Sequence, residues 1–215
     1  MIVTVASFKG GVGKTTTAFH LAQYFSERGA TLLVDGDPNR SATEWARRGE
    51  GEAGQPTLAF KVVDERASVM HAKAAQYVVI DTQARPTTED LKALVEGCDL
   101  LILPTTSDLL AAQVMMTTVS MLRSLKSERF RVLLTRVRGA KAGKDARETL
   151  IEGGLPVFEA SIPNLVVFET AANLGVPVSA VKDANAARAW DAYAAVGREV
   201  EAVNMPTDAR AGKKP

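Results

Sequence analysis

A glycine-rich segment close to the N-terminus constrains the fold of this chain more than any other feature. Residues 9–16 read KGGVGKTT, directly after an apolar run at residues 2–7 and at the start of a stretch with helical character at residues 15–28. Glycines allow a tight backbone turn with the N–H groups aimed inward, and the positive end of the following helix adds to their field. Such a loop between a strand and a helix is typical of phosphate-binding sites. The alternative, a glycine-rich turn that binds nothing, leaves the order of lysine and hydroxyl residues unexplained.

The side chains of this loop have separate expected tasks. Lys14 can reach the β- and γ-phosphates of a nucleotide, and the Thr15 hydroxyl can ligate Mg²⁺. The standard pattern has a glycine where this chain has Phe8, and Lys9 is an additional lysine. The residues expected to contact the nucleotide are Gly10, Gly11, Val12, Gly13, Lys14, Thr15 and Thr16.

Short runs rich in Val, Ile and Leu alternate with helical stretches along the chain. The predicted strands are residues 2–7, 31–35, 77–81, 100–103 and 131–135, with weaker candidates at 58–63 and 157–162. The predicted helices are residues 15–28, 41–48, 66–75, 88–95, 108–125, 144–153, 165–174 and 185–203. This alternation predicts an α/β fold with a mostly parallel twisted sheet covered by helices on both faces. Together with the glycine-rich loop between the first strand and the first helix, it is typical of the P-loop NTPase type. No linker divides the chain, so we expect one domain over residues 1–204 and a polar tail at 205–215.

Polar side chains follow several of the predicted strands. Asp35 and Asp37 come after the second strand, Asp81 ends another, and Thr135 and Arg136 close the last. Ligands of open parallel sheets bind beyond the carboxyl ends of the strands, so we expect these groups at one edge beside the loop. The alternative for the carboxylates is local turn chemistry at Asp-Gly and Asp-Pro, or capping of the next turn.

Composition disfavours several other classes of protein. The single cysteine, Cys98, cannot form an internal disulfide and is too little for a cysteine-based zinc or iron–sulfur site within the chain. Neither histidine has a serine or cysteine partner that the sequence reveals, so we expect no nucleophilic triad. No run approaches the roughly 18 apolar residues of a membrane span, and the N-terminus lacks the basic region of a secretory signal.

Charge is distributed unevenly along the chain. Residues 123–147 hold nine basic and two acidic residues, a net charge of +7, which leaves −6 for the rest because the whole chain carries +1. A basic segment can attract a polyanion, although a solvated surface or an acidic partner is the alternative. The nine are Arg123, Lys126, Arg129, Arg131, Arg136, Arg138, Lys141, Lys144 and Arg147.

The glycine-rich loop resembles the deviant Walker A motif of the ParA/MinD family of P-loop ATPases, and the resemblance extends over residues 1–180. The matching segments are 32–38 (LLVDGDP, an Asp-x-Asp-Pro motif), 77–82 (YVVIDT, a Walker B strand), 101–105 (LILPT), and 169–171 with 175–178 (ETA and GVPV). Within the family, SATEW at residues 41–45 is similar to the small ParF-type partition ATPases. The chain departs from the pattern at residues 83–86 (QARP), where a Thr-Pro-Pro run is common, and at Asn39, where Gln is usual.

The resemblance implies roles for individual residues. It implies that Lys9 crosses to the nucleotide of a partner subunit, so that two ATP molecules are sandwiched in a homodimer, and that Asp37 orients the attacking water. With Lys14, these form the expected catalytic set. The residues expected to hold Mg²⁺ or its waters are Thr15, Asp35 and Asp81. The residues expected near adenine are Thr135, Arg136 and Pro163.

The resemblance also implies partners and a cellular role. It implies slow, adaptor-stimulated ATP hydrolysis that positions a cargo, which could be a plasmid, a chromosome or a protein organelle such as a carboxysome. The expected partners are nonspecific DNA and a ParB-like or other adaptor protein, with a cytoplasmic, nucleoid-associated location and no membrane. The expected DNA contacts are Arg123, Lys126, Arg138, Lys141, Lys144 and Arg147.

Two related functions stay open at the level of sequence. A MinD-like membrane-surface ATPase needs a C-terminal amphipathic helix with a basic face, whereas residues 185–203 carry mixed charge. An ATP-dependent ligase similar to dethiobiotin synthetase is compatible with the motifs, although Lys9 and the basic segment favour a ParA-type protein.

Overall fold

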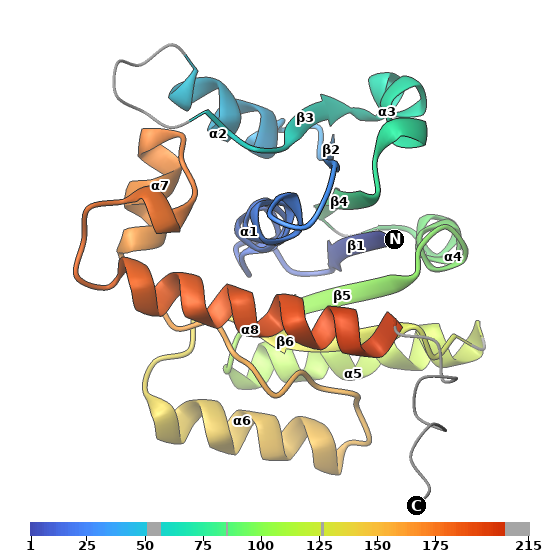
Figure 1. Ribbon diagram of the computed structural model, residues 1–215. Coiled ribbons are helices and arrows are strands. Elements are labelled where there is room, and N and C mark those ends of the chain that lie inside the picture. Colours follow the sequence, from blue (N-terminus) through green and yellow to red (C-terminus); the bar gives the residue numbers. More distant parts are fainter. Residues whose placement is uncertain (51–56, 85, 126, 205–215) are drawn as a thin grey trace, which may run out of the picture.

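The computed structural model describes residues 1–50, 57–84, 86–125 and 127–204, and a parallel sheet of six strands lies at its centre (Figure 1). The strands are β1 (Ile2–Ser7), β2 (Thr31–Gly36), β3 (Lys61–Asp64), β4 (Tyr77–Ala84), β5 (Leu100–Thr105) and β6 (Phe130–Leu134). Their order across the sheet is β3-β2-β4-β1-β5-β6. The predicted α/β class with a parallel sheet is therefore confirmed.

Helices cover both faces of this sheet. They are α1 (Lys14–Ser26), α2 (Ser41–Gly49), α3 (Glu65–His71), α4 (Thr88–Glu96), α5 (Leu109–Ser124), α6 (Ala140–Glu152), α7 (Val167–Leu174) and α8 (Ala186–Asn204), with short 3₁₀ turns η1 (Ala72–Ala74) and η2 (Val178–Ala180). One face packs against α1, α2, α7 and α8, and the other against α4, α5 and α6. Among the described residues, none of these helices is both long enough and apolar enough to span a membrane.

The continuous apolar strands follow from this double cover. Successive side chains of a strand point to opposite faces, so a strand buried on both faces needs apolar residues at every position. In β2, Leu33 packs in the core that α1 and α8 complete. Its neighbours Leu32 and Val34 pack on the other face, where Ala67 of α3 contacts them. The run that predicted this strand is therefore explained by two cores rather than one.

All six strands end at the same edge of the sheet, and this edge carries the polar residues that the sequence analysis identified. Asp35 of β2 is the direct neighbour of Asp81 of β4 in the strand register. Val5 of β1 is the neighbour of Asp81 on the other side. The glycine-rich loop follows β1 at this same edge of the sheet. The parallel sheet therefore brings the acids and the loop together.

The weak strand candidate at residues 157–162 was wrong as a strand of the sheet. This segment contacts β6 without a continuous ladder: an isolated bridge pairs Val132 with Val157, and the Phe158 and Ile162 N–H groups donate to the carbonyls of Val132 and Leu134. A second isolated bridge, beyond β6, pairs Val137 with Pro163. Between the two bridges, the N–H groups of Glu159 and Ala160 donate to the Glu199 carboxylate of α8, at 2.8 and 2.7 Å. The Ala160 N–H lies between the two groups that donate to β6, so a side chain takes a donor that a regular ladder would use. The polar tail predicted at residues 205–215 lies outside the described residues.

Candidate functional site

The loop between β1 and α1 has the backbone conformation that its glycines predict. Gly11 and Gly13 have φ angles of 74° and 82°, in the left-handed region that side chains disfavour. Gly13 is the N-cap of α1 and has no side chain with which to cap the first turn. The N-terminal N–H groups of α1 therefore border the loop, where helix geometry favours an anion.

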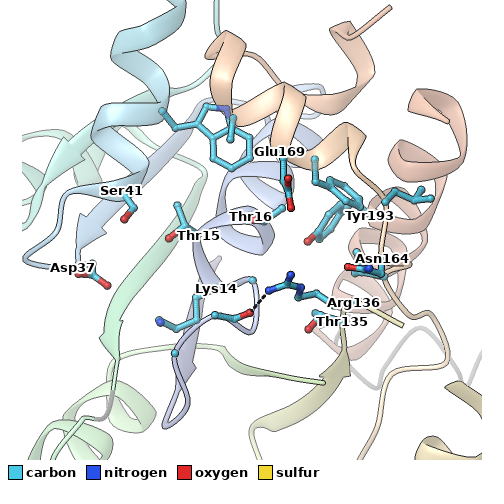
Figure 2. A pocket seen from close by; sticks show the side chains of 18 of the residues that line it. Lys14, Thr15, Thr16, Asp37, Ser41, Thr135, Arg136, Asn164, Glu169 and Tyr193 are labelled. Carbon is cyan, nitrogen blue, oxygen red and sulfur yellow. Dashed lines mark hydrogen bonds between the residues drawn. The ribbon is translucent and has the colours of Figure 1, made fainter. Parts of the chain in front are cut away.

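The end of β6 anchors this loop. The Thr135 hydroxyl donates to the carbonyl oxygens of Val12, at 2.7 Å, and Thr105, at 3.1 Å. Arg136 Nη1 donates to the Gly11 carbonyl at 2.9 Å (Figure 2). Arg136 also has a φ of 52°, a strained value for a residue with a side chain. Thr135, Arg136 and Pro163 all line the cavity beside the loop, and the first two also fix the shape of the loop. Their contact with adenine stays a prediction.

Asp81 is the buried carboxylate of the site. It is 0% exposed, and neither of its oxygens accepts a well-formed hydrogen bond from the described residues. Burial raises the pKa of Asp81 to about 7. The Thr15 hydroxyl, in a geometry too poor to satisfy either oxygen, and the Lys14 ammonium group lower this pKa, whereas Asp35 and Asp37 raise it. A carboxylate left in this state is costly and favours a nearby cation.

The residues here fit Mg²⁺. Mg²⁺ keeps several waters and binds through one or two carboxylates together with phosphate oxygens. An unpartnered Asp81 beside Thr15 matches such a site, in which Asp81 would hold a water on the ion and Thr15 would provide a hydroxyl. Within the described ranges, no three His, Cys, Asp or Glu side chains form a metal cage by themselves. Nucleotide oxygens and water would therefore supply the remaining ligands.

The other two acids have different surroundings. Asp35 accepts hydrogen bonds from the backbone N–H and the hydroxyl of Thr43, at 2.8 and 2.7 Å, and from the Asp37 N–H at 3.3 Å. Asp35 thus fixes the first turn of α2 and the turn that carries Asp37. The carboxylate of Asp37 accepts from the Asn39 N–H at 2.9 Å and lines the cavity. Contact of Asp35 with Mg²⁺ and orientation of an attacking water by Asp37 both stay predictions.

The cavity beside the loop has a volume of about 680 Å³. Figure 2 shows Lys14 and Thr15 on one side of it and Arg136, Asn164 and Tyr193 on the other. Lys14 is 8% exposed, which favours a counter-charge such as a phosphate. Several residues that line the cavity have no site role predicted from the sequence; they are Ser41, Glu44, Trp45, Arg48, Asn164, Phe168, Glu169 and Tyr193. The motifs at residues 41–45 and 169–171 gave the only signal, because they resemble family segments without a residue role.

A buried histidine, His20, connects the first turn of α1, directly after the loop, to η2. His20 accepts a hydrogen bond at Nε2 from the Val178 N–H, at 3.1 Å. Nδ1 therefore carries the proton and donates to the Thr16 carbonyl, at 2.7 Å. The ring is stacked on Tyr193 with centroids 4.7 Å apart. Burial lowers the pKa of His20 to about 4, so the neutral ring connects the start of α1 to η2.

The two lysines of the loop lie apart. Lys14 lines the main cavity, whereas Lys9 lines a second cavity of about 430 Å³ on the other side of residues 10 and 11. The Nζ atom of Lys9 lies 3.0 Å from both carboxylate oxygens of Asp108, just before α5. Lys9 thus does not face the nucleotide cavity of its own subunit.

The basic segment does not form one surface. Arg138, Lys141 and Lys144 are exposed at the beginning of α6, near the carboxyl ends of the strands. Arg123 lies near the amino ends of the strands, at the end of α5, where it donates to the Gly154 carbonyl at 2.6 Å. Arg147 is ion-paired with a glutamate and donates to a backbone carbonyl. Lys126 lies outside the described residues. The basic residues at the end of α5 and those at the start of α6 are separated by the five residues of β6, which span roughly 16 Å.

Comparisons with known proteins agree with this geometry. A model of the CobQ/CobB/MinD/ParA nucleotide binding domain matches residues 3–178. The chain is 36% identical over 207 residues to "Maintenance of carboxysome distribution protein A" of Gloeobacter kilaueensis, covering 93% of this chain and 94% of that protein.

Two solved structures show the same fold. The MinD cell division protein of Aquifex aeolicus superposes with a TM-score of 0.74 at 15% identity, covering 95% of this chain and 98% of that one. A variant of Cyanothece McdA in complex with ATP gives a TM-score of 0.68 at 20% identity, covering 91% and 96%. With its phosphate loop, its acids and the family match along most of its length, the chain belongs to the CobQ/CobB/MinD/ParA family of nucleotide-binding domains.

Proposed function

We propose that this chain is a ParA-type ATPase that closes as a homodimer over two ATP molecules, binds nonspecific DNA and positions a cargo with an adaptor protein. The observation that carries the proposal is that Lys14 and Thr15 line the cavity while the unpartnered Asp81 is buried beside them. A P-loop helix start, a poorly hydrated lysine and a buried acid without a partner all favour a Mg²⁺-bound nucleotide.

The residues at the cavity have different roles in hydrolysis. Phosphoryl transfer depends mainly on positioning and on stabilising charge. Lys14 and the backbone N–H groups of the loop hold the phosphates, and Asp37 orients the attacking water. Mg²⁺, when bound through Thr15 and water held by Asp81, supplies charge neutralisation at the β- and γ-phosphates. Thr135 and Arg136 keep the loop open for the phosphates through the carbonyls of Val12 and Gly11.

The cargo that we propose is a protein organelle of the carboxysome type. The support is the similarity to "Maintenance of carboxysome distribution protein A" of Gloeobacter kilaueensis, which extends over 93% of this chain. A plasmid or a chromosome is the alternative within the same class of function. The proposed DNA surface consists of Arg138, Lys141 and Lys144, because they are exposed at the edge of the sheet that carries the nucleotide site.

The experiment that tests the ATPase is steady-state phosphate release, combined with binding of a fluorescent ATP analogue. Lys14→Ala should weaken nucleotide binding at least 10-fold and abolish turnover. Asp37→Ala should retain binding and lose turnover by about 100-fold, because loss of an oriented water affects only the transition state. Lys92→Ala, an exposed lysine of α4, is the matched control and should behave as wild type. Equal turnover in the Lys14 and Lys92 variants would refute the proposal.

A further inference from the structure

Lys9 has a defined partner within its own subunit. Its Nζ atom lies 3.0 Å from both Oδ1 and Oδ2 of Asp108, so the carboxylate receives the ammonium group on both oxygens. The Ser7 hydroxyl accepts from the Lys9 N–H at 3.1 Å and donates to the Lys9 carbonyl at 3.0 Å. The Thr106 hydroxyl donates to Asp108. Both ends of the pair are therefore oriented by short-range contacts.

The pair joins two adjacent strands of the sheet. Lys9 follows β1 and Asp108 follows β5, and these strands are neighbours in the strand order. Both side chains line the second cavity, together with the glycine backbone at residues 10 and 11 and with Arg136. Gly10, Gly11 and Arg136 also line the nucleotide cavity. The pair thus holds the Lys9 ammonium group on the side of the loop that faces away from the cavity of its own nucleotide.

We propose that Asp108 is a positioning residue that retains Lys9 in its own subunit until a second nucleotide-bound copy of the chain competes for it. The inference rests on the proposed function, in which Lys9 contacts the phosphates of the partner's nucleotide. Asp108 engages two of the three N–H donors of the ammonium group, so a partner's phosphate that takes the same donors competes with the carboxylate. A triphosphate carries more negative charge than one carboxylate or a diphosphate, so the exchange is most favourable when the partner has bound ATP.

The exposure of the pair sets the strength of this competition. The Lys9 and Asp108 side chains are 38% and 49% exposed, so water screens their attraction. An exposed pair of this kind shifts an equilibrium by between about 1.4-fold and 5-fold. Closure of a dimer breaks two such pairs. Removing the Asp108 charge should therefore lower the dissociation constant of the dimer by between about 2-fold and 30-fold.

The test measures the dissociation constant of the dimer by sedimentation equilibrium, with Mg²⁺ and a non-hydrolysable ATP analogue and, separately, with ADP. Asp108→Asn removes the charge and keeps the shape of the side chain, and Asp108→Glu restores the charge. Asp145→Asn, at an exposed aspartate of α6, is the control for the change in net charge. Affinity for a fluorescent ATP analogue in dilute monomer and the thermal midpoint report whether each variant is folded and can bind nucleotide.

The expected result is a tighter analogue-bound dimer for Asp108→Asn, with wild-type values for Asp108→Glu and Asp145→Asn and unchanged nucleotide affinity in all. An unchanged or weaker dimer in folded Asp108→Asn would overturn the role of Asp108 while leaving the proposed function intact. If neither wild type nor Asp108→Asn dimerises with the analogue, the sandwich and the inference both fail. Dimers of Asp108→Asn alone would support the inference.

Discussion

Single residues at this site differ chiefly in whether their polar atoms already have partners. Thr135 and Arg136 direct their donors at the carbonyls of the loop, so they shape it before a ligand arrives. Asp35 is likewise satisfied, by Thr43 and the backbone of Asp37. Asp81 has no such partner among the described residues. The first group therefore preorganises the site, whereas Asp81 is free to favour a cation.

His20 gives a prediction about pH and stability. Its pKa is about 4 in the folded chain, below its ordinary 6.5, so the unfolded chain binds more protons between these values. Above about pH 6.5, protonation of His20 therefore does not lower the free energy of unfolding. As the pH drops from there toward 4, the free energy of unfolding falls. Between about pH 7.5 and 5, wild type should lose about 2 kcal/mol more than His20→Gln in urea unfolding.

The comparison with His20→Gln isolates the histidine from Asp81. The pKa of Asp81 is raised to about 7, so the folded chain takes up a proton as the pH falls through that value, which increases stability. This opposite contribution is present in both proteins and cancels in the difference of slopes. Parallel pH profiles for the two proteins would show that His20 is not buried as the neutral ring.

Among the helices, the pair α2 and α7 forms the outer wall of the cavity. Trp45 of α2 donates through Nε1 to the Val176 carbonyl, at 3.1 Å, directly after α7. Arg48 donates to the Ala172 carbonyl at 3.2 Å. The helices also meet through two glycines: a Cβ placed on Gly175 would lie 2.0 Å from the Gly49 nitrogen. The two helices thus approach through their backbones.

Gly175→Ala tests this contact. Gly175 has a φ of 74°, so alanine would be strained there even without the clash against Gly49. We expect a loss of about 2–4 kcal/mol of unfolding free energy, because backbone strain and overpacking add. Asn173→Ala, at an exposed position of α7, is the control and should change stability by less than about 0.5 kcal/mol. Urea unfolding measures both, and a Gly175 variant as stable as the control would show that α2 and α7 separate easily.

Over the whole molecule, the fold decides which charges act together. The basic segment is continuous in sequence, but β6 carries its two halves to opposite edges of the sheet. The half at the start of α6 shares an edge with the nucleotide site. This arrangement would let nucleotide-dependent closure of a dimer place two copies of Arg138, Lys141 and Lys144 on one DNA surface.

The DNA surface can be tested by changing those three residues together. Alanine at Arg138, Lys141 and Lys144 should weaken binding to random-sequence DNA and reduce the salt slope by about 2 to 3 per subunit, because phosphate contacts release counterions. Alanine at the exposed bases Arg66, Lys73 and Lys92 makes the same change in net charge elsewhere. Fluorescence anisotropy at several salt concentrations measures both sets. Equal losses in the two sets would attribute the binding to net charge alone.

Much of this protein could be predicted from segments that are continuous in sequence. The strand–loop–helix unit at residues 2–26 follows from an apolar run, two glycines with positive φ and a helix start, all of them neighbours along the chain. The acids after the strands could be placed at one edge because parallel strands end together. Residues 157–162 could not be assigned correctly, because Glu199 of α8, 39 residues from Ala160, takes the Ala160 N–H and interrupts the ladder with β6.

The sequence by itself determined the parallel sheet, the phosphate loop and the edge where its ligands gather, because backbone propensity and burial on both faces act over short distances. Only the tertiary structure decided that Thr135 fixes the loop from 123 residues away, that Lys9 meets Asp108 across 99, and that Asp35 is satisfied while Asp81 is not. The reason is physical: hydrogen bonds and ion pairs depend on where strand ends and helix starts meet in space, and residue order does not specify that.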